Sequence, residues 1–542
     1  MQLAVFVRAA LVVACGFVSS AAAQSLWPWS LETKLVAPDA DAGDRFGAAL
    51  AAQGALALVG APFDDQAGVD AGAIYAYSHS SGGWVLEAKL VSPAPRAQGH
   101  FGYSLAIDAN VAVVGSPSLL GTTSGDAFVF RRNGSAWTFD AQLTPASPHR
   151  DFGSTVDVSR DVVVVGAPTI VGGSAGLARI FRFSGTSWVP ATTLSSSASK
   201  YGLSVAVYDK TVIVTSPATL VAPSAVVYQQ IAPNAWQQSA TITPPFIPQL
   251  WGRSIALGDG ILAVGAVQTN GLGIAYVDTF DYDVQSSGGF TLTGHLHEDN
   301  PISHYKDWFG DSVALEAATA NSNAMLVAGA PRENFTAKHD GMAHVYTRIG
   351  PNWKRVARLT APDAAQFDEF GSAVAFAGGS VLVGAWQHDA PAQDSGAVYS
   401  YGLTSVPTLY CTAKLNTLGC TPTISATGSP SASAGSSFVV DCTNTLPEKL
   451  GVLFYGGGAQ IVPFRGGWLC VKAPLERAAA LAATSGSFCD GSYSVDFNAY
   501  IASGQDPALV AGTIVHSQWA TRDPLDAWGS GLSDALQFLI GP

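Results

Sequence analysis

The chain has little charge and few basic residues. Charged side chains make up 12% of its 542 residues, and the formal net charge is −13. A surface of this sign lacks the basic face that sequence-independent nucleic-acid binding requires, and it is equally unsuited to an anionic lipid surface. Since 48% of the residues are apolar, the chain can bury a large core. We therefore exclude nucleic acid as a partner and expect a globular protein.

Long apolar runs are missing beyond the N-terminus, so we expect no membrane span. At the N-terminus, Arg8 precedes an apolar stretch over 9–18, and the small residues 21–23 precede Gln24. This order of features predicts a signal peptide over residues 1–23, cleaved after Ala23. The protein is then secreted or held at the cell surface.

A short pattern recurs about every 54 residues, and such periodicity indicates a repeat architecture. Its first element is an aromatic residue followed by glycine. The seven copies are Phe46-Gly47, Phe101-Gly102, Phe152-Gly153, Tyr201-Gly202, Trp251-Gly252, Phe309-Gly310 and Phe370-Gly371. A Gly-Ala-Pro-like triplet begins thirteen residues after the first glycine in six copies, and nineteen residues after it in the sixth copy.

Two further elements complete each copy. One is a short aromatic strand such as residues 73–77, and the other pairs an aromatic residue with an aliphatic residue six positions later, as in Trp84 and Leu90. The even spacing predicts that both side chains of this pair lie on one face of a strand. About four short strands per copy and no helical pattern predict an all-β fold, a seven-bladed β-propeller.

The chain ends indicate how the ring closes. The aromatic–aliphatic strand occurs once before the first Phe-Gly, at residues 29–36, and is absent after the last aromatic strand near Tyr401. We therefore expect residues 29–36 to supply the outermost strand of blade seven. An open solenoid would have no reason to displace one strand in this way.

The Phe-Gly and Gly-Ala-Pro elements, in phase over residues 29–402, resemble the FG-GAP repeat of integrin α subunits and of many bacterial secreted proteins. The resemblance implies a propeller over 24–402 and a calcium site of the form D-x-D-x-D-G-x-x-D after Gly-Ala-Pro. This chain departs from that form. The remaining carboxylates are Asp64, Asp65 and Asp70 in the first copy and Asp389 and Asp394 in the seventh. They predict one weak calcium site, or else turn residues that cap a hairpin.

The last quarter of the chain contains five of the six cysteines, which marks a domain boundary and an oxidising compartment. After a linker at 403–408, residues 409–542 resemble a small domain found at the ends of bacterial exported proteins, and alternating stretches predict a β-sandwich-like unit. We predict the local disulfides Cys411–Cys420 and Cys470–Cys489, with Cys442 free. Spacing alone does not fix this connectivity.

The strongest local cluster of possible ligating residues is the segment 294–300. His295 and His297 are predicted to share a strand face, with Glu298, Asp299 and His304 nearby, which suits zinc. The alternative is an exposed outer strand without metal. The serines after Phe-Gly occur at a position that is small in all seven copies, so we interpret them as packing residues rather than nucleophiles.

These observations predict a monomeric, exported, non-enzymatic binding or adhesion protein, without a firmly assigned cofactor, that presents propeller loops to an extracellular protein or glycan. Two alternatives stay open. One is a hydrolase of polysaccharide or lipid with its site on the propeller face, and the other is a lectin-like sugar-binding protein.

Overall fold

The computed structural model describes residues 29–541 apart from short segments. The segments outside the description are 81–82, 120–122, 169–175, 197, 199, 218–222, 245–249, 268–274, 284–288, 298–306, 319–323, 335–336, 350–351, 390, 404–406, 433–436 and 511–512. The predicted signal peptide over 1–23 also lies outside the described residues. Among the helices that the structure describes, none is long and apolar enough to cross a membrane.

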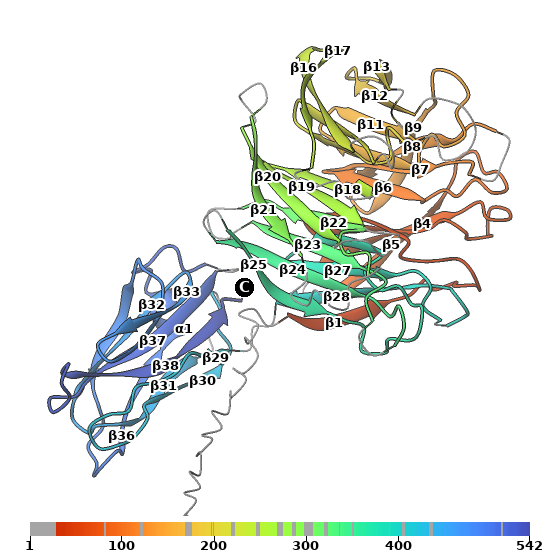
Figure 1. Ribbon diagram of the computed structural model, residues 1–542. Coiled ribbons are helices and arrows are strands. Elements are labelled where there is room, and N and C mark those ends of the chain that lie inside the picture. The colour runs from red at the N-terminus through yellow and green to blue at the C-terminus, as the bar shows by residue number, and fades with distance from the viewer. Residues whose placement is uncertain are drawn as a thin grey trace, which may run out of the picture.

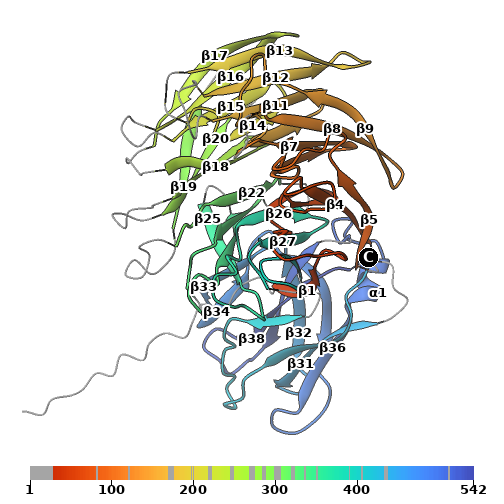
Figure 2. The same ribbon diagram turned by 90° about the vertical axis from the view of Figure 1, so that its right-hand side faces the viewer.

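Seven four-stranded antiparallel sheets follow one another around the repeat region, which confirms the β-propeller prediction (Figures 1 and 2). We number these blades in chain order. Blades 1 to 3 contain β2–β5 (Ala49–Gln53, Leu56–Ala61, Ala73–Ser80, Gly83–Val91), β6–β9 (Ser104–Asp108, Val111–Ser116, Asp126–Asn133, Ala136–Leu143) and β10–β13 (Thr155–Ser159, Val162–Ala167, Leu177–Phe183, Trp188–Ser195). Blades 4 to 6 contain β14–β17 (Val205–Tyr208, Thr211–Ser216, Ser224–Ala232, Ala235–Ile242), β18–β21 (Leu250–Gly258, Ile261–Val267, Tyr276–Tyr282, Phe290–Leu296) and β22–β25 (Ser312–Glu316, Met325–Ala330, Met342–Ile349, Asn352–Leu359).

Blade 7 draws its strands from both ends of the repeat region. It contains β26–β28 (Ala373–Ala377, Ser380–Ala385, Ala397–Leu403) and β1 (Trp29–Leu35), which pairs antiparallel with β28. In Figure 1 the red strand β1 lies against the teal strand β28, so the first and last strands of the propeller share one sheet. Such pairing joins the chain start to the last blade and leaves no open edge between them.

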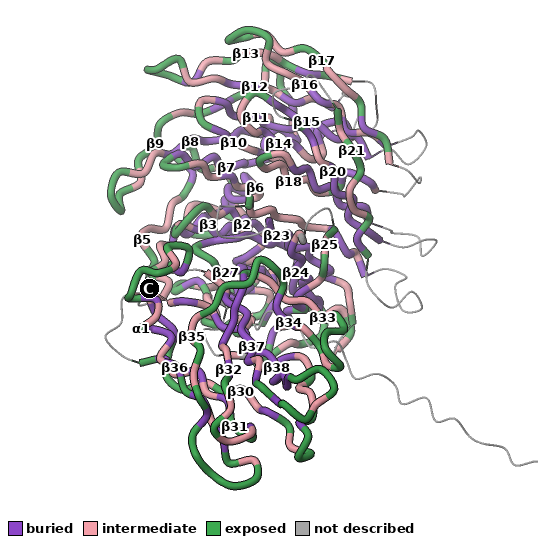
Figure 3. The backbone as a smooth tube through the Cα atoms, turned by 90° about the vertical axis from the view of Figure 1, so that its left-hand side faces the viewer, coloured by how far each residue is buried: buried purple, intermediate pink, exposed green. Residues whose placement is uncertain are grey.

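The core of the propeller lies between neighbouring blades. The second strands, such as β7 and β11, are buried along their whole length, whereas the outermost strands β5, β9 and β13 are largely exposed or intermediate (Figure 3). The aromatic residue of each Phe-Gly pair fills the space between two blades. Phe46, for example, is fully buried and packs edge to face on Tyr75 at 5.2 Å between ring centroids.

The glycines of the repeat allow this close approach. A Cβ atom at Gly329 would come closer than 3.0 Å to the carbonyl oxygen of Gly371 in the next blade, and the same holds for Gly115 against Gly153. Gly310 donates its N–H to the Gly329 carbonyl at 2.8 Å within its own blade. The two glycine elements of the repeat therefore mark the contacts between blades, where glycine permits backbone to touch backbone.

The prediction that the aromatic and aliphatic residues of each outer strand share a face is wrong. A β-bulge interrupts the pairing of the outermost strand in every blade, with one extra residue at Glu32 in β1 and at Glu87 in β5. The extra residue reverses the alternation of side chains. Trp84 therefore packs between blades 7 and 1, while Leu90 packs between blades 1 and 2.

The C-terminal unit consists of two packed sheets, as expected for a sandwich. The five-stranded sheet has the order β29-β38-β37-β32-β35, the three-stranded sheet β30-β31-β36, and β33-β34 form a separate hairpin. The bounds are β29 (Thr408–Tyr410), β30 (Thr423–Gly428), β31 (Phe438–Thr445), β32 (Leu450–Gly456), β33 (Ala459–Phe464), β34 (Gly467–Val471), β35 (Glu476–Ala482), β36 (Gly491–Asp496), α1 (Phe497–Ala502), β37 (Ile514–Arg522) and β38 (Ser530–Leu539). Phe438 from one sheet and Phe538 from the other meet at 4.8 Å in the core.

The predicted local disulfides are wrong. The bonds are Cys411–Cys470 and Cys420–Cys489, with Cα–Cα distances of 6.3 and 6.4 Å. Tyr410 at the end of β29 packs against Cys470 and donates its hydroxyl to the Cys470 carbonyl at 2.9 Å, so Cys411 lies beside β34. Each cysteine therefore bonds to a distant strand or loop.

Cys442 is free and fully buried on β31, as predicted. Burial raises the pKa of its thiol. A buried neutral thiol in this position acts as a small apolar side chain.

Candidate ligand pocket at the channel mouth

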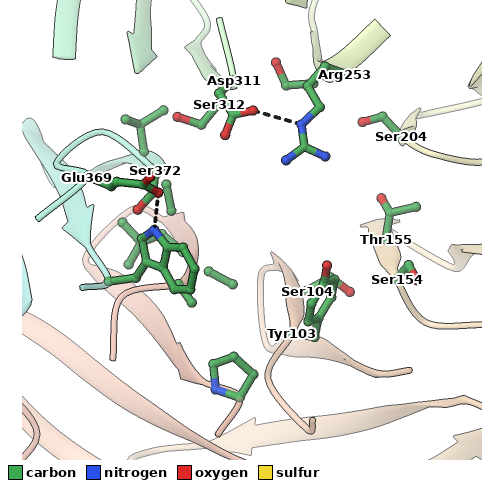
Figure 4. A pocket seen from close by; sticks show the side chains of 18 of the residues that line it. Tyr103, Ser104, Ser154, Thr155, Ser204, Arg253, Asp311, Ser312, Glu369 and Ser372 are labelled. Carbon is green, nitrogen blue, oxygen red and sulfur yellow. Dashed lines mark hydrogen bonds and ion pairs between the residues drawn. The ribbon is translucent and has the colours of Figure 1, made fainter. Parts of the chain in front are cut away.

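A pocket of about 640 Å³ lies where the innermost strands of all seven blades begin. Two adjacent positions from every copy line it. The residues that directly follow the Phe-Gly glycine form what we term the variable ring, which consists of Ala48, Tyr103, Ser154, Leu203, Arg253, Asp311 and Ser372. The next residues form the small ring, which consists of Ala49, Ser104, Thr155, Ser204, Ser254, Ser312 and Ala373. Figure 4 shows labelled members of both rings around a common space.

The small ring connects the blades. Its serine hydroxyls donate to the Phe-Gly carbonyl of the following blade, in the pairs Ser104–Gly153 (2.8 Å), Ser254–Gly310 (2.7 Å) and Ser312–Gly371 (2.8 Å). A hydroxyl that donates in this way still has lone pairs to accept with. The small ring is therefore a structural seam that also offers hydrogen-bond acceptors to the pocket.

The variable ring carries the chemical differences between the copies. Arg253 donates from Nε to Asp311 Oδ1 at 2.8 Å (Figure 4). The Asp311 charge raises the pKa of Arg253, and burial raises the pKa of Tyr103. Small or aliphatic residues occupy the other positions, so the wall of the pocket is chemically asymmetric although the backbone that carries it is repeated.

Blades 6, 7 and 1 add a continuous arc of aromatic and charged side chains, which we term the arginine arc. The Arg332 guanidinium lies over the Trp308 ring at 3.5 Å and donates to Glu369 Oε1 at 3.2 Å. The other carboxylate oxygen of Glu369 accepts from Trp386 Nε1 at 2.9 Å (Figure 4). Cation–π stacking and a shared carboxylate hold these side chains in fixed positions.

Arg45 completes the arginine arc. Its guanidinium carbon lies 4.2 Å from the Phe63 ring centre and 4.4 Å from that of Trp386. Burial lowers the pKa of Arg45, while the nearby carboxylates of Asp394 and Glu369 act in the opposite direction. The guanidinium is thus charged, partly desolvated and positioned by two rings from different blades.

The repeat itself matches a described family. The family model of the FG-GAP repeat matches residues 29–77, 84–130 and 353–401. The chain carries FG-GAP repeats. These segments include β1 to β8 and β25 to β28, some of them in part.

Solved structures similar to the FG-GAP propeller include the β-propeller domain of Cps50 (Swd1) from Myceliophteria thermophila, at 9% identity and a TM-score of 0.43, covering 70% of this chain and 100% of that one. Sqt1 from Chaetomium thermophilum matches at 13% identity and a TM-score of 0.39, covering 66% and 83%. A putative 6-phosphogluconolactonase from Bacteroides uniformis matches at 13% identity and a TM-score of 0.39, covering 58% and 85%. No curated protein matches the chain.

The predicted calcium residues of the first copy lie in one loop of the FG-GAP propeller, after β3. Asp64 is buried, lies 2.6 Å from the Lys89 ammonium and accepts from the Tyr75 hydroxyl at 3.1 Å. Asp65 accepts the backbone N–H of Asp70 at 2.7 Å. These carboxylates therefore pair with a lysine and accept hydrogen bonds from backbone N–H groups, as in a capped turn.

The loop of the seventh copy is built in the same way. Asp389 accepts the backbone N–H of Asp394 at 2.9 Å. His388 stands at the position that Asp64 has in the first copy, and the Nε2 atom of His388 lies 2.6 Å from the Lys34 ammonium. In the described part of the chain, no group of three or more His, Cys, Asp or Glu side chains is arranged to hold a metal ion. A calcium site in either loop stays a prediction.

The two predicted zinc ligands lie at the end of β21. His295 Nδ1 is 2.7 Å from Asp278 Oδ1, and the rings of His295 and His297 are 6.4 Å apart. The buried Asp278 also accepts from Trp251 Nε1 at 2.9 Å, so it orients the imidazole of His295 within the blade. Glu298, Asp299 and His304 lie outside the described residues.

The arginine arc was not among the predicted site residues. Its only sequence signal is that Arg45 and Glu369 directly precede Phe-Gly, and that Trp386 stands where most copies have the proline of Gly-Ala-Pro. Those are positions at which the copies differ. The sequence does not show that the differing positions of separate copies meet at one pocket.

Proposed function

We propose that the protein is an exported, non-enzymatic binding protein whose ligand, carried by an extracellular protein or glycan, enters the pocket at the channel mouth. One observation supports this above all others. The position that directly follows the Phe-Gly glycine carries six different residue types in seven copies, while its neighbour in sequence stays small in all seven. Such variation at one cavity-lining position of a repeat suits recognition of one asymmetric ligand.

Pocket chemistry favours binding over the hydrolase alternative. The serine hydroxyls at 104, 254 and 312 resemble possible nucleophiles, yet each donates its proton to a backbone carbonyl of the next blade. A nucleophilic serine donates instead to a general base. The hydroxyls of the small ring therefore connect neighbouring blades and can still accept hydrogen bonds.

Capture experiments with the full chain test this proposal. The wild-type protein is immobilised and exposed to a glycan array and to cell-envelope extracts, beside the pocket variant Arg253→Met and the control variant Arg182→Ala. Arg182 is a matched arginine on β12, the third strand of blade 3. It is paired with Asp161 at 2.7 Å and does not line the pocket. We expect capture to fall with Arg253→Met and to persist with Arg182→Ala. Equal capture by both variants would refute the pocket as the binding site, and turnover of a captured glycan would support the hydrolase instead.

A further inference from the structure

Arg45 presents unused hydrogen-bond donors at the edge of the pocket. The guanidinium group carries five N–H donors in its plane, and two aromatic rings lie against it. Within the described residues, no hydrogen bond or ion pair engages the Arg45 side chain, although it lines the cavity. A planar fork of this kind pairs with a carboxylate through two parallel hydrogen bonds.

Among the charged side chains that line the pocket, Arg45 is the cation without a hydrogen-bonded carboxylate, although Asp394, Asp70 and Glu369 lie close enough to act on its charge. Three arginines and two carboxylates line the cavity. Asp311 is paired with Arg253, and Glu369 with Arg332 and Trp386. Arginines therefore outnumber carboxylates among the residues that line the cavity, in a chain with a formal net charge of −13.

The floor of the pocket offers acceptors for hydroxyl groups. The hydroxyls of three small-ring serines, Ser104, Ser254 and Ser312, donate to backbone carbonyls. The lone pairs of their oxygens therefore remain for a ligand. Thr155 and Ser204 place two more hydroxyls in the same ring (Figure 4). A ligand that matches this floor carries several hydroxyl donors around one compact body.

We propose that the pocket binds a sugar acid, with the carboxylate on the in-plane donors of Arg45 and the sugar hydroxyls on the small ring. This inference rests on the proposed function and names the ligand class of the same pocket. A uronic acid unites a carboxylate and several hydroxyl donors on one ring. An extended acidic peptide offers one backbone N–H per residue, and these point alternately to opposite sides, which fits a closed ring of acceptors poorly. The cavity of about 640 Å³ is of the size used for small ligands.

Isothermal titration calorimetry of the full chain tests the ligand class. The probes are trigalacturonate, its methyl ester, which keeps the hydroxyls and loses the charge, and hexaglutamate. The variants are Arg45→Ala, Arg45→Lys, which keeps the charge and loses the fork, and the control Arg465→Ala. Arg465 also lies over an aromatic ring, Phe464 at 5.4 Å, but in the C-terminal unit.

We expect trigalacturonate to bind the wild type and the ester to bind at least about ten-fold more weakly. Arg45→Ala should weaken the acid by about ten- to a hundred-fold, Arg45→Lys by less, and Arg465→Ala not at all. If the Arg45→Ala variant fails to fold, the Arg45→Lys variant, which keeps the charge, serves as the test of the guanidinium fork. Equal affinity for acid and ester, or no effect at Arg45, or no binding of trigalacturonate, would overturn the proposal.

The experiments distinguish a failure of the sugar-acid inference from a failure of the proposed function. Binding of hexaglutamate in place of trigalacturonate, with loss on Arg45→Ala, would replace the sugar acid by an acidic peptide while the pocket keeps its role. Envelope capture that is indifferent to Arg253→Met would instead remove the pocket as the site altogether.

Discussion

Contact between blades can be tested at Gly329, where we predict that alanine destabilises the propeller. The added Cβ would come closer than 3.0 Å to the Gly371 carbonyl, so blades 6 and 7 must move apart. Overpacking of this kind costs about 1–3 kcal/mol. The shift also weakens the hydrogen bond from the Ser312 hydroxyl to the Gly371 carbonyl, which is 2.8 Å long and contributes about 1 kcal/mol. The expected loss is about 2–4 kcal/mol.

Differential scanning calorimetry of the full chain measures the effect. For a unit of this size, the loss corresponds to a fall in melting temperature of about 3–5 °C. Gly258→Ala is the matched control, because nothing lies within 4 Å of a Cβ at Gly258 and its backbone needs no left-handed conformation. That substitution should be neutral or stabilise by up to about 1 kcal/mol. If Gly329→Ala melts within about 1 °C of Gly258→Ala, the explanation of the repeat by close contact between blades is wrong.

Four further predictions concern closure, disulfides, pH and metal. Deletion of residues 25–36 should lower the melting temperature of the whole propeller in one cooperative transition, whereas a separate transition for one blade would argue against a closed ring. Replacement of Cys420 and Cys489 by serine should remove about 4 kcal/mol from the C-terminal unit and leave the propeller transition unchanged in calorimetry. Burial raises the pKa of Asp157 to about 7 from 3.8, so the folded chain binds more protons between about pH 4 and 7 and this group's contribution to stability falls as pH rises through that window. Melting temperatures measured across that range should therefore slope less for Asp157→Asn than for the wild type, and parallel curves would contradict the assignment. Added calcium or a chelator should leave the melting temperature unchanged, since Lys89 neutralises Asp64 in the first loop and His388 replaces that carboxylate in the seventh, and a shift above about 2 °C would support a calcium site.

The fold could be predicted because each copy solves the same packing problem. Close contact between blades favours glycine, with Thr215 as the exception at the Gly-Ala-Pro position, and the space beside it is filled by an aromatic ring, so Phe46-Gly47 and its counterparts are visible as a repeat. The face of the outer strand on which each side chain lies could not be predicted, because the residue at the β-bulge has no fixed type. It is Glu87 in blade 1 and Ala191 in blade 3.

The site could be predicted less well, for a different physical reason. The chain shows that Arg45 and Trp386 depart from the pattern of the other copies, but they are far apart in sequence. Ring closure makes blades 7 and 1 neighbours and brings the two side chains to 4.4 Å. Long-range disulfides were missed for the same reason, because the packing of β29 and β34 beside β38, rather than sequence distance, brings Cys411 to Cys470.

The variable ring and the small ring at the channel mouth are one residue apart in each copy and have separate structural roles. A substitution at a variable-ring position changes the cavity wall, while the seam that joins the blades depends on the residue beside it. Ligand preference can therefore drift by point mutation without loss of the scaffold. The same separation makes the propeller a natural host for combinatorial libraries, in which seven positions are randomised and the glycines and small residues are left alone.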